Sequence, residues 1–107
     1  MAVRNHKKVD KTVKEIRKLL EDRYLPDHPK AKMDVYRYNS ASVRIRVIDP
    51  SFAGLDWIER DTLLWEMLED LSEDTLSQIT LLLCLAPNEI GKSMMNMEFE
   101  DPTPTRF

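Results

Sequence analysis

The chain has 107 residues, enough for one small domain with a single hydrophobic core. Its hydrophobic content of 42% and charged content of 33% are typical of a globular protein and exclude a disordered one. The single cysteine, Cys84, excludes a disulfide framework and a zinc site built from several cysteines. The longest apolar run is too short to span a bilayer, and the N-terminus lacks the apolar core of a signal peptide. We therefore expect a cytoplasmic protein with no membrane partner.

Charge is unevenly distributed along the chain. Residues 1–32 carry ten Lys or Arg and five Asp or Glu, a net charge of +5, whereas residues 55–75 carry eight acidic residues and one Arg, a net charge of −7. Such asymmetry concerns orientation and partner choice rather than the fold. Two interpretations stay open: two solvated helix faces, or a basic end that contacts an acidic partner or nucleic acid.

The first three predicted elements are a helix and a hairpin. A helix is expected over residues 10–24, where apolar residues recur at helical spacing and prolines follow. Residues 32–38 and 43–48 alternate between apolar and polar side chains, which predicts two antiparallel strands joined by a short polar turn. In the second strand Val, Ile and Val face the core, and Arg44 and Arg46 face away from it.

The remaining predicted elements are a helix over 57–71 and a strand over 78–85. Asp56 and Glu59 have the spacing of a capping box, which marks the start of the helix. Its apolar stripe is expected to comprise Ile58, Leu68 and Leu71 with both tryptophans, Trp57 and Trp65, and Leu64. In the strand, alternation predicts Ile79, Leu81, Leu83 and Leu85 on one face and Leu82 and Cys84 on the other.

These elements predict an α+β fold of order α-β-β-α-β, with a three-stranded mixed sheet and both helices packed on one face. Residues 1–92 form the domain, and residues 93–107 form a C-terminal tail rich in Met and Phe. Because Leu82 and Cys84 are expected on the outer face and need cover, we predict a homodimer.

Residues 43–65 resemble the signature of the BolA family. Phe52, Gly54, Arg60 and Trp65 fall on its pattern of F-x-G, then five residues, then Arg, and a mid-helix aromatic residue. The resemblance covers about residues 10–90. It implies a BolA-like, class II KH-like fold, no enzymatic activity, and partners such as monothiol glutaredoxins with shared iron–sulfur clusters or, in some members, DNA.

Two histidines of the family pattern are replaced in this chain. Asp61 follows the family arginine, and Gln78 stands where a histidine is proposed as a cluster ligand in the family. Glutamine is a poor iron ligand, so we expect no cofactor, no metal and no shared cluster.

The residues of the resemblance also have expected physical roles. Phe52 should close one end of the core, Gly54 should allow a positive φ or a close approach, and Trp65 should press on the sheet. Arg60 lies in the first turn of its helix, where the helix dipole disfavours a cation. It is expected either to reach a partner or to pair with a nearby carboxylate, namely Asp56, Glu59 or Asp61.

The outer face of the hairpin is the predicted contact surface. Tyr36, Tyr38, Arg44 and Arg46 should share it, and aromatic rings between arginines can stack bases and hold phosphates. Cross-strand Tyr–Arg pairing, within one chain or inside a dimer, is the alternative interpretation. With Arg60 and Gln78, these residues form the candidate surface for a protein or a nucleic acid.

No enzymatic motif is convincing in the sequence. The segment 86–93 matches a relaxed phosphate-binding loop, but Pro87 lacks an N–H and Glu89 would repel phosphates. The carboxylates of residues 56–74 follow a solvated helix face without a catalytic partner. We therefore predict a non-enzymatic interaction module that binds protein, with nucleic-acid binding and a glutaredoxin partnership as alternatives and no small-molecule substrate.

Overall fold

The structure, a computed structural model, describes residues 10–92. The expected tail 93–107 and the start of the basic N-terminal segment lie outside the described residues. The elements in chain order are α1 Lys11–Arg23, β2 Lys32–Asn39, β3 Ser42–Ile48, the 3-10 helix η1 Pro50–Gly54, α2 Trp57–Leu68, α3 Glu73–Gln78, β4 Ile79–Leu85 and the 3-10 helix η2 Pro87–Lys92. No helix in this range has the length and apolar character that a bilayer-spanning helix needs.

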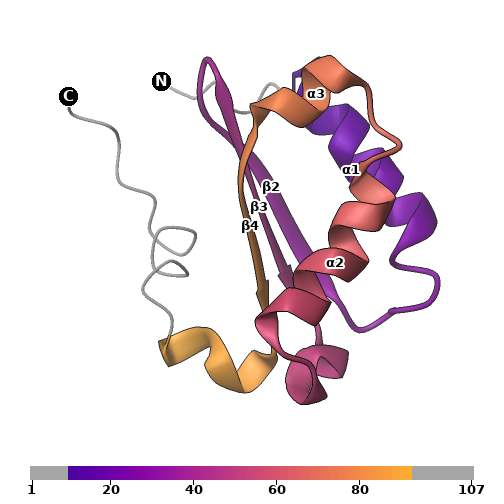
Figure 1. Cartoon of the computed structure of the whole chain (residues 1–107), viewed down its shortest axis with the longest axis vertical. Helices are drawn as coiled ribbons and strands as arrows, with labels where there is room; N and C mark the ends of the chain where they lie inside the picture. The colour runs from indigo at the N-terminus through magenta and orange to yellow at the C-terminus, as the bar shows by residue number, and fades with distance from the viewer. Residues whose placement is uncertain (1–9, 93–107) are drawn as a thin grey trace.

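The three strands form one mixed sheet in the order β2-β3-β4. β2 and β3 are antiparallel, and β3 and β4 are parallel. Both long helices lie on the same face of the sheet, with α1 against β2 and α2 against β4 (Figure 1). The predicted α+β class and the predicted two-layer arrangement are confirmed.

The main core lies between the sheet and the two long helices. Val43, Ile45 and Val47 of β3 are completely buried in it, as alternation predicted. A second apolar cluster occupies the other face of the sheet and includes Ile48, Leu83 and Leu85. The sheet therefore carries apolar side chains on both faces near its β4 side.

Side chains of the residues before them start the two long helices. The carboxylate of Asp10 accepts a hydrogen bond from the Val13 amide at 2.9 Å. At α2 the Asp56 carboxylate accepts from the Glu59 amide at 2.8 Å, and the Glu59 carboxylate accepts from the Asp56 amide at 2.9 Å. Both donors would otherwise lack a partner, so the predicted capping box is confirmed.

Replacing the cap should destabilise the fold measurably. We expect Asp56→Ala to lower the free energy of unfolding by about 1 kcal/mol, because the Glu59 amide loses its acceptor. Asp56→Ser should retain most of the stability, since a hydroxyl can accept the same bond. Urea unfolding followed by circular dichroism measures both; equal losses in the two variants would contradict a capping role.

The second helix is shorter than predicted and buries a different face. It ends at Leu68, and its buried residues are Arg60, Leu64 and Leu68. The prediction that Trp57 and Ile58 join the apolar stripe is wrong, because they are 55% and 76% exposed. The deeply buried arginine replaces them on the inner face.

A short helix, α3, occupies the stretch between the predicted helix 57–71 and the predicted strand 78–85. Ser72 caps it by accepting a hydrogen bond from the Thr75 amide at 3.3 Å. Glu15 of α1 accepts hydrogen bonds from the Thr75 hydroxyl and, at 3.2 Å, from the Ser72 amide. These contacts fasten α3 to α1 and position the start of β4.

The faces of β4 are the reverse of the prediction. Leu82 and Cys84 pack on the main core under α2, and Leu81, Leu83 and Leu85 belong to the outer cluster. The pairing with β3 is irregular between Ile79 and Leu81, so strict alternation counted from Ile79 gives the wrong face. The argument that Leu82 and Cys84 need cover on the outer face is therefore wrong.

Candidate functional site

The four Tyr and Arg residues of the hairpin do share the outer face, but their cations are engaged within the chain. The Arg44 guanidinium lies 3.6 Å from the centre of the Tyr38 ring and donates to the Tyr36 hydroxyl at 3.5 Å. Arg46 donates to the Asp34 carboxylate on β2, with its Nε at 2.8 Å, and is 8% exposed. The arrangement is the cross-strand pairing that stood as the alternative interpretation.

Arg60 is an interior residue rather than part of an exposed surface. The residue is 3% exposed, and its two terminal nitrogens donate to the Glu89 carboxylate of η2 at 2.7 and 2.9 Å. The prediction that it pairs with Asp56, Glu59 or Asp61 is wrong.

The remaining hydrogen bonds of Arg60 go to main-chain carbonyls. The guanidinium donates to the carbonyls of Phe52 at 2.7 Å, Leu55 at 3.0 Å and Cys84 at 3.1 Å. One guanidinium thus joins α2, η1, β4 and η2. The pKa of Arg60 is raised, chiefly by the hydrogen bond with Glu89, so the cation is fixed there.

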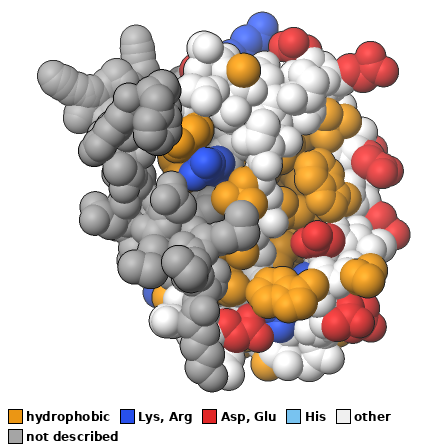
Figure 2. Space-filling model, turned by 60° about the vertical axis from the view of Figure 1, so that its left-hand side comes forward, with side chains coloured by type: hydrophobic (Ala, Val, Ile, Leu, Met, Phe, Trp, Pro, Cys, Tyr) orange, Lys and Arg blue, Asp and Glu red, His pale blue; other side chains and the backbone are white. Residues whose placement is uncertain are grey.

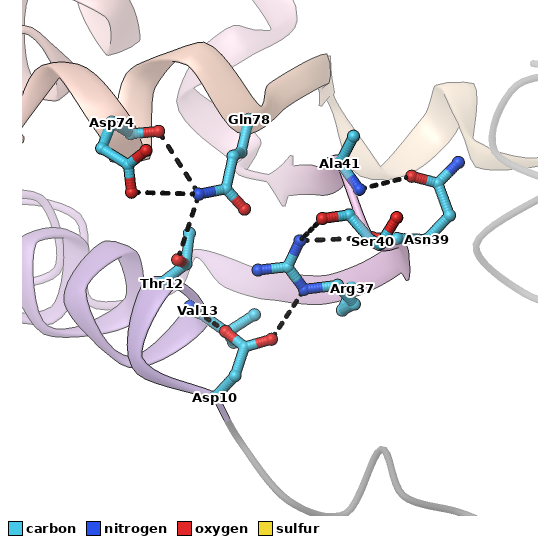
Figure 3. Close-up of polar contacts among 9 residues, drawn as sticks. All are labelled: Asp10, Thr12, Val13, Arg37, Asn39, Ser40, Ala41, Asp74 and Gln78. Atoms are coloured by element: carbon cyan, nitrogen blue, oxygen red, sulfur yellow. Dashed lines mark hydrogen bonds and ion pairs between the residues drawn. The ribbon is translucent and has the colours of Figure 1, made fainter.

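Gln78 lies at the end of α3, beside the start of α1 (Figure 3). Its amide nitrogen donates to the Asp74 carbonyl at 3.3 Å and to the Thr12 hydroxyl at 3.4 Å. Nearby, Arg37 Nε donates to the Asp10 carboxylate at 2.7 Å and holds the pKa of that carboxyl below its usual value. Gln78 therefore links α3 to α1.

The three other residues of the resemblance have mixed outcomes. Phe52 is fully buried in the core, as expected. Trp65 packs against the core while partly buried. Gly54 has no positive φ, and an added Cβ would meet no atom within 4 Å, so its expected conformational role is wrong.

A polar cluster absent from the sequence-based predictions surrounds the buried carboxylate of Asp49. Tyr24 donates its hydroxyl to Asp49, and His28 Nδ1 lies 2.9 Å from the same carboxylate. The His28 ring stacks on the Tyr24 ring at 4.1 Å, and Ser51 Oγ lies 3.4 Å from His28 Nδ1. In a catalytic triad the carboxylate and the hydroxyl use different ring nitrogens, so this geometry is that of a structural latch.

Opposing effects act on the pKa of Asp49. Burial alone would raise this pKa, but hydrogen bonds from Tyr24 and Ser51 outweigh burial and hold it below the usual value. Burial likewise raises the pKa of Tyr24. The cluster ties the loop after α1 to the end of β3. The order Asp-Pro-Ser, typical of the start of a short helix, is the sequence feature that could have indicated the role of Asp49 as a cap.

The open edge of β4 is a second candidate for a functional site. Among residues 10–92, β3 is the only strand beside β4, whose sequence contains no charged residue. Trp57 and Ile58 are exposed on α2, the helix that contacts β4. The Arg60 guanidinium, which binds the Cys84 carbonyl of β4, lies 4.7 Å from the Trp57 ring centre. Figure 2 shows apolar side chains gathered on this face, next to several acidic ones.

The thiol of Cys84 lies in the interior of the fold. Cys84 is buried, and burial raises the pKa of its thiol to about 12, so the thiol is protonated near neutral pH. In the described part of the chain, no three His, Cys, Asp or Glu residues are grouped to hold a metal ion.

The class of protein defined by these elements is an α+β domain with a three-stranded mixed sheet and two long helices on one of its faces. No protein-family model matches the sequence, and no curated protein matches it. Among solved structures, the BolA domain of SufE1 from Arabidopsis thaliana is similar, with 18% identity and a TM-score of 0.49. The match covers 75% of this chain and 96% of that domain. At this identity the likeness concerns the fold alone.

Proposed function

We propose that this chain is a non-enzymatic interaction module that binds another protein along the open edge of β4. The observation that carries the proposal is the pairing of an uncharged edge strand with the exposed apolar residues Trp57 and Ile58. An open strand edge presents main-chain donors and acceptors, which natural proteins usually protect unless they use them. An exposed apolar patch beside it supplies contact area.

The two edges of the sheet differ in a way that supports this choice. The other edge strand, β2, carries Lys32, Asp34 and Arg37, and charged side chains discourage edge-to-edge pairing. The strand β4 reads Ile-Thr-Leu-Leu-Leu-Cys-Leu and has no such protection. A partner strand is therefore expected at β4 rather than at β2.

The competing functions have less support in the geometry. A phosphate-binding face would need available cations, whereas Arg44 contacts Tyr36 and Tyr38, and Arg46 is buried against Asp34. The homodimer stays a prediction. The argument that Leu82 and Cys84 need cover on the outer face does not support it, because both side chains face the core. For the glutaredoxin alternative, Gln78 and Asp61 still replace the family histidines.

Site-specific photo-cross-linking in cells tests the proposal. A photoreactive phenylalanine analogue is placed at Ile58, beside the β4 edge, and separately at Lys18, an exposed position of α1. We expect protein adducts at position 58 that resist nuclease, because the bound partner covers this side chain. Position 18 should give few adducts, since it lies away from the edge.

Two outcomes would contradict the proposed function. Adducts at 58 that disappear after nuclease treatment would assign the surface to nucleic acid. Equal and weak labelling at positions 58 and 18 would show that no protein occupies the β4 edge.

A further inference from the structure

We propose that the partner at the β4 edge is an extended segment of another protein in which apolar side chains alternate with Lys or Arg. The inference rests on the proposed function and names the chemistry of the segment that the edge would bind. It follows from the main-chain groups of β4, from the side chains of α2 above them, and from the charge of this side.

The main-chain groups at the open edge can be assigned from the hydrogen bonds. The Leu85 carbonyl accepts from the Asp49 amide at 2.9 Å, so the main-chain N–H and C=O of Leu85 point toward the β3 side of the strand. The N–H and C=O of successive residues in a strand point to opposite edges, so the main-chain groups of Leu82 and Cys84 point toward the open edge, while their side chains face the core. The Arg60 bond to the Cys84 carbonyl at 3.1 Å, made from outside the sheet, agrees with this assignment.

One end of the edge is closed by the chain itself. The Ala86 amide donates to the Glu89 carboxylate at 2.9 Å, and the same carboxylate binds Arg60. Arg60 and Glu89 thus occupy the positions that a neighbouring strand would take beyond Cys84. The N–H and C=O of Leu82 lie before this closure, and they are the groups offered to an added strand.

The side chains above the edge are apolar and acidic. Arg60 of α2 binds the Cys84 carbonyl, and the charge of Asp61 acts on the Cys84 thiol, so Asp61 lies near β4, with Ile58 and Trp65 three and four residues away on the same side of α2. Burial raises the pKa of the Asp61 carboxyl, in keeping with a position partly enclosed by neighbouring atoms.

Charge selects the kind of segment that fits. Residues 55–75 have eight acidic residues and one Arg, and this arginine is buried against Glu89. Successive side chains of an added strand would point to opposite faces of the sheet. Lys or Arg on the α2 side would meet Asp61 and the acidic surface seen in Figure 2, and apolar side chains at the alternate positions would contact the outer cluster around Leu81. Two copies paired through β4 would bring two acidic helices together, which disfavours a second copy as the occupant.

Labelled peptides test the inference directly. The probe is a fluorescein-labelled peptide of alternating Lys and Val, about seven residues long, the usual length of a strand. We expect saturable binding by fluorescence anisotropy and slower hydrogen exchange of the Leu82 amide. A Glu-Val peptide should bind at least about tenfold more weakly through charge repulsion. A Lys-Val peptide methylated on every backbone amide should lose binding, because neither of its edges can donate to the strand.

Two matched charge reversals, one beside the β4 edge and one on α1, test where the peptide binds on the protein. Asp61→Lys should weaken Lys-Val binding about tenfold, because it reverses the charge next to the edge. Glu21→Lys makes the same charge change on an exposed position of α1 and should alter binding less than about twofold. Circular dichroism of both variants checks that the fold is retained.

Each other outcome overturns the inference in a recognisable way. Equal binding of the Glu-Val peptide, or of the methylated peptide, shows that charge or strand pairing does not govern the contact. A dimer by light scattering, with Leu82 protected in the absence of peptide, identifies a second copy as the occupant. If no peptide binds while protein adducts form at position 58, the proposed function stands and the partner chemistry is wrong. Absence of those adducts contradicts the proposed function itself.

Discussion

Replacing Arg60 by Met should lower the free energy of unfolding by about 3 kcal/mol, the usual cost of removing one partner from a buried ion pair. Methionine fills a similar volume but supplies no donor. The carbonyls of Phe52 and Cys84, together with the Glu89 carboxylate, would lose hydrogen bonds that span four elements. Buried acceptors without donors account for most of the expected loss. Urea unfolding at neutral pH measures it.

Two control variants separate the network from general effects. Glu89→Gln keeps an acceptor for Arg60 and should cost only about 1 kcal/mol, the difference between a charged and a neutral hydrogen bond. Lys14→Met, an exposed cation of α1 replaced by the same residue, should change stability by less than about 0.5 kcal/mol. A loss at Arg60 no larger than the loss at Lys14 would show that the network contributes nothing.

Periodicity predicted the parts of the fold that have one apolar face. Val43, Ile45 and Val47 alternate with Arg44 and Arg46, and the structure buries the first three in the main core. The capping box at Asp56 marked the start of α2 because its two side chains and two amides are local in sequence. Local hydrogen bonds and regular spacing are both readable from the sequence.

Predictions failed where a distant residue or an irregularity decides the structure. Arg60 is buried because Glu89, 29 residues later, supplies its counter-charge, and no local pattern joins the two. With an arginine on the inner face of α2, the helix turns Trp57 and Ile58 toward solvent. The irregular pairing near Thr80 reverses the faces of β4, and alternation cannot reveal an inserted residue.

The candidate site was hidden from the sequence for the same reasons. An apolar strand is equally consistent with a covered centre and an open edge, so β4 alone did not indicate which groups are available. The strand order shows that its second edge lacks a neighbour among residues 10–92, and α2 brings Trp57 and Ile58 beside it. The site thus depends on topology, which single-sequence patterns leave open.

Asp49→Asn should lower the free energy of unfolding at neutral pH by about 2 kcal/mol, because hydrogen bonds to a charged acceptor become bonds to a neutral one. The Asp49 carboxylate accepts hydrogen bonds from Tyr24 and from the Ser51 amide, and it lies 2.9 Å from His28. Asparagine has one acceptor oxygen where aspartate has two, so the closely packed Tyr24–His28 stack loses part of its anchor.

The pH dependence of this loss identifies the carboxylate as its source. In the fold the pKa of Asp49 lies below its ordinary value of 3.8, so its stabilising effect is complete above the pKa of the unfolded chain and disappears as pH falls through the folded-state pKa. The stability difference between the wild-type protein and the variant should therefore shrink between about pH 5 and about pH 2.

Urea unfolding at a series of pH values measures that difference. The carboxyls of Asp10 and Glu15, whose pKa values are also lowered, titrate equally in both proteins and cancel. Asp27→Asn, an exposed position in the loop before β2, serves as the matched control and should leave the pH profile unchanged. A constant difference between wild type and Asp49→Asn across this range would mean that the loss comes from packing and that the Asp49 charge does not stabilise the latch.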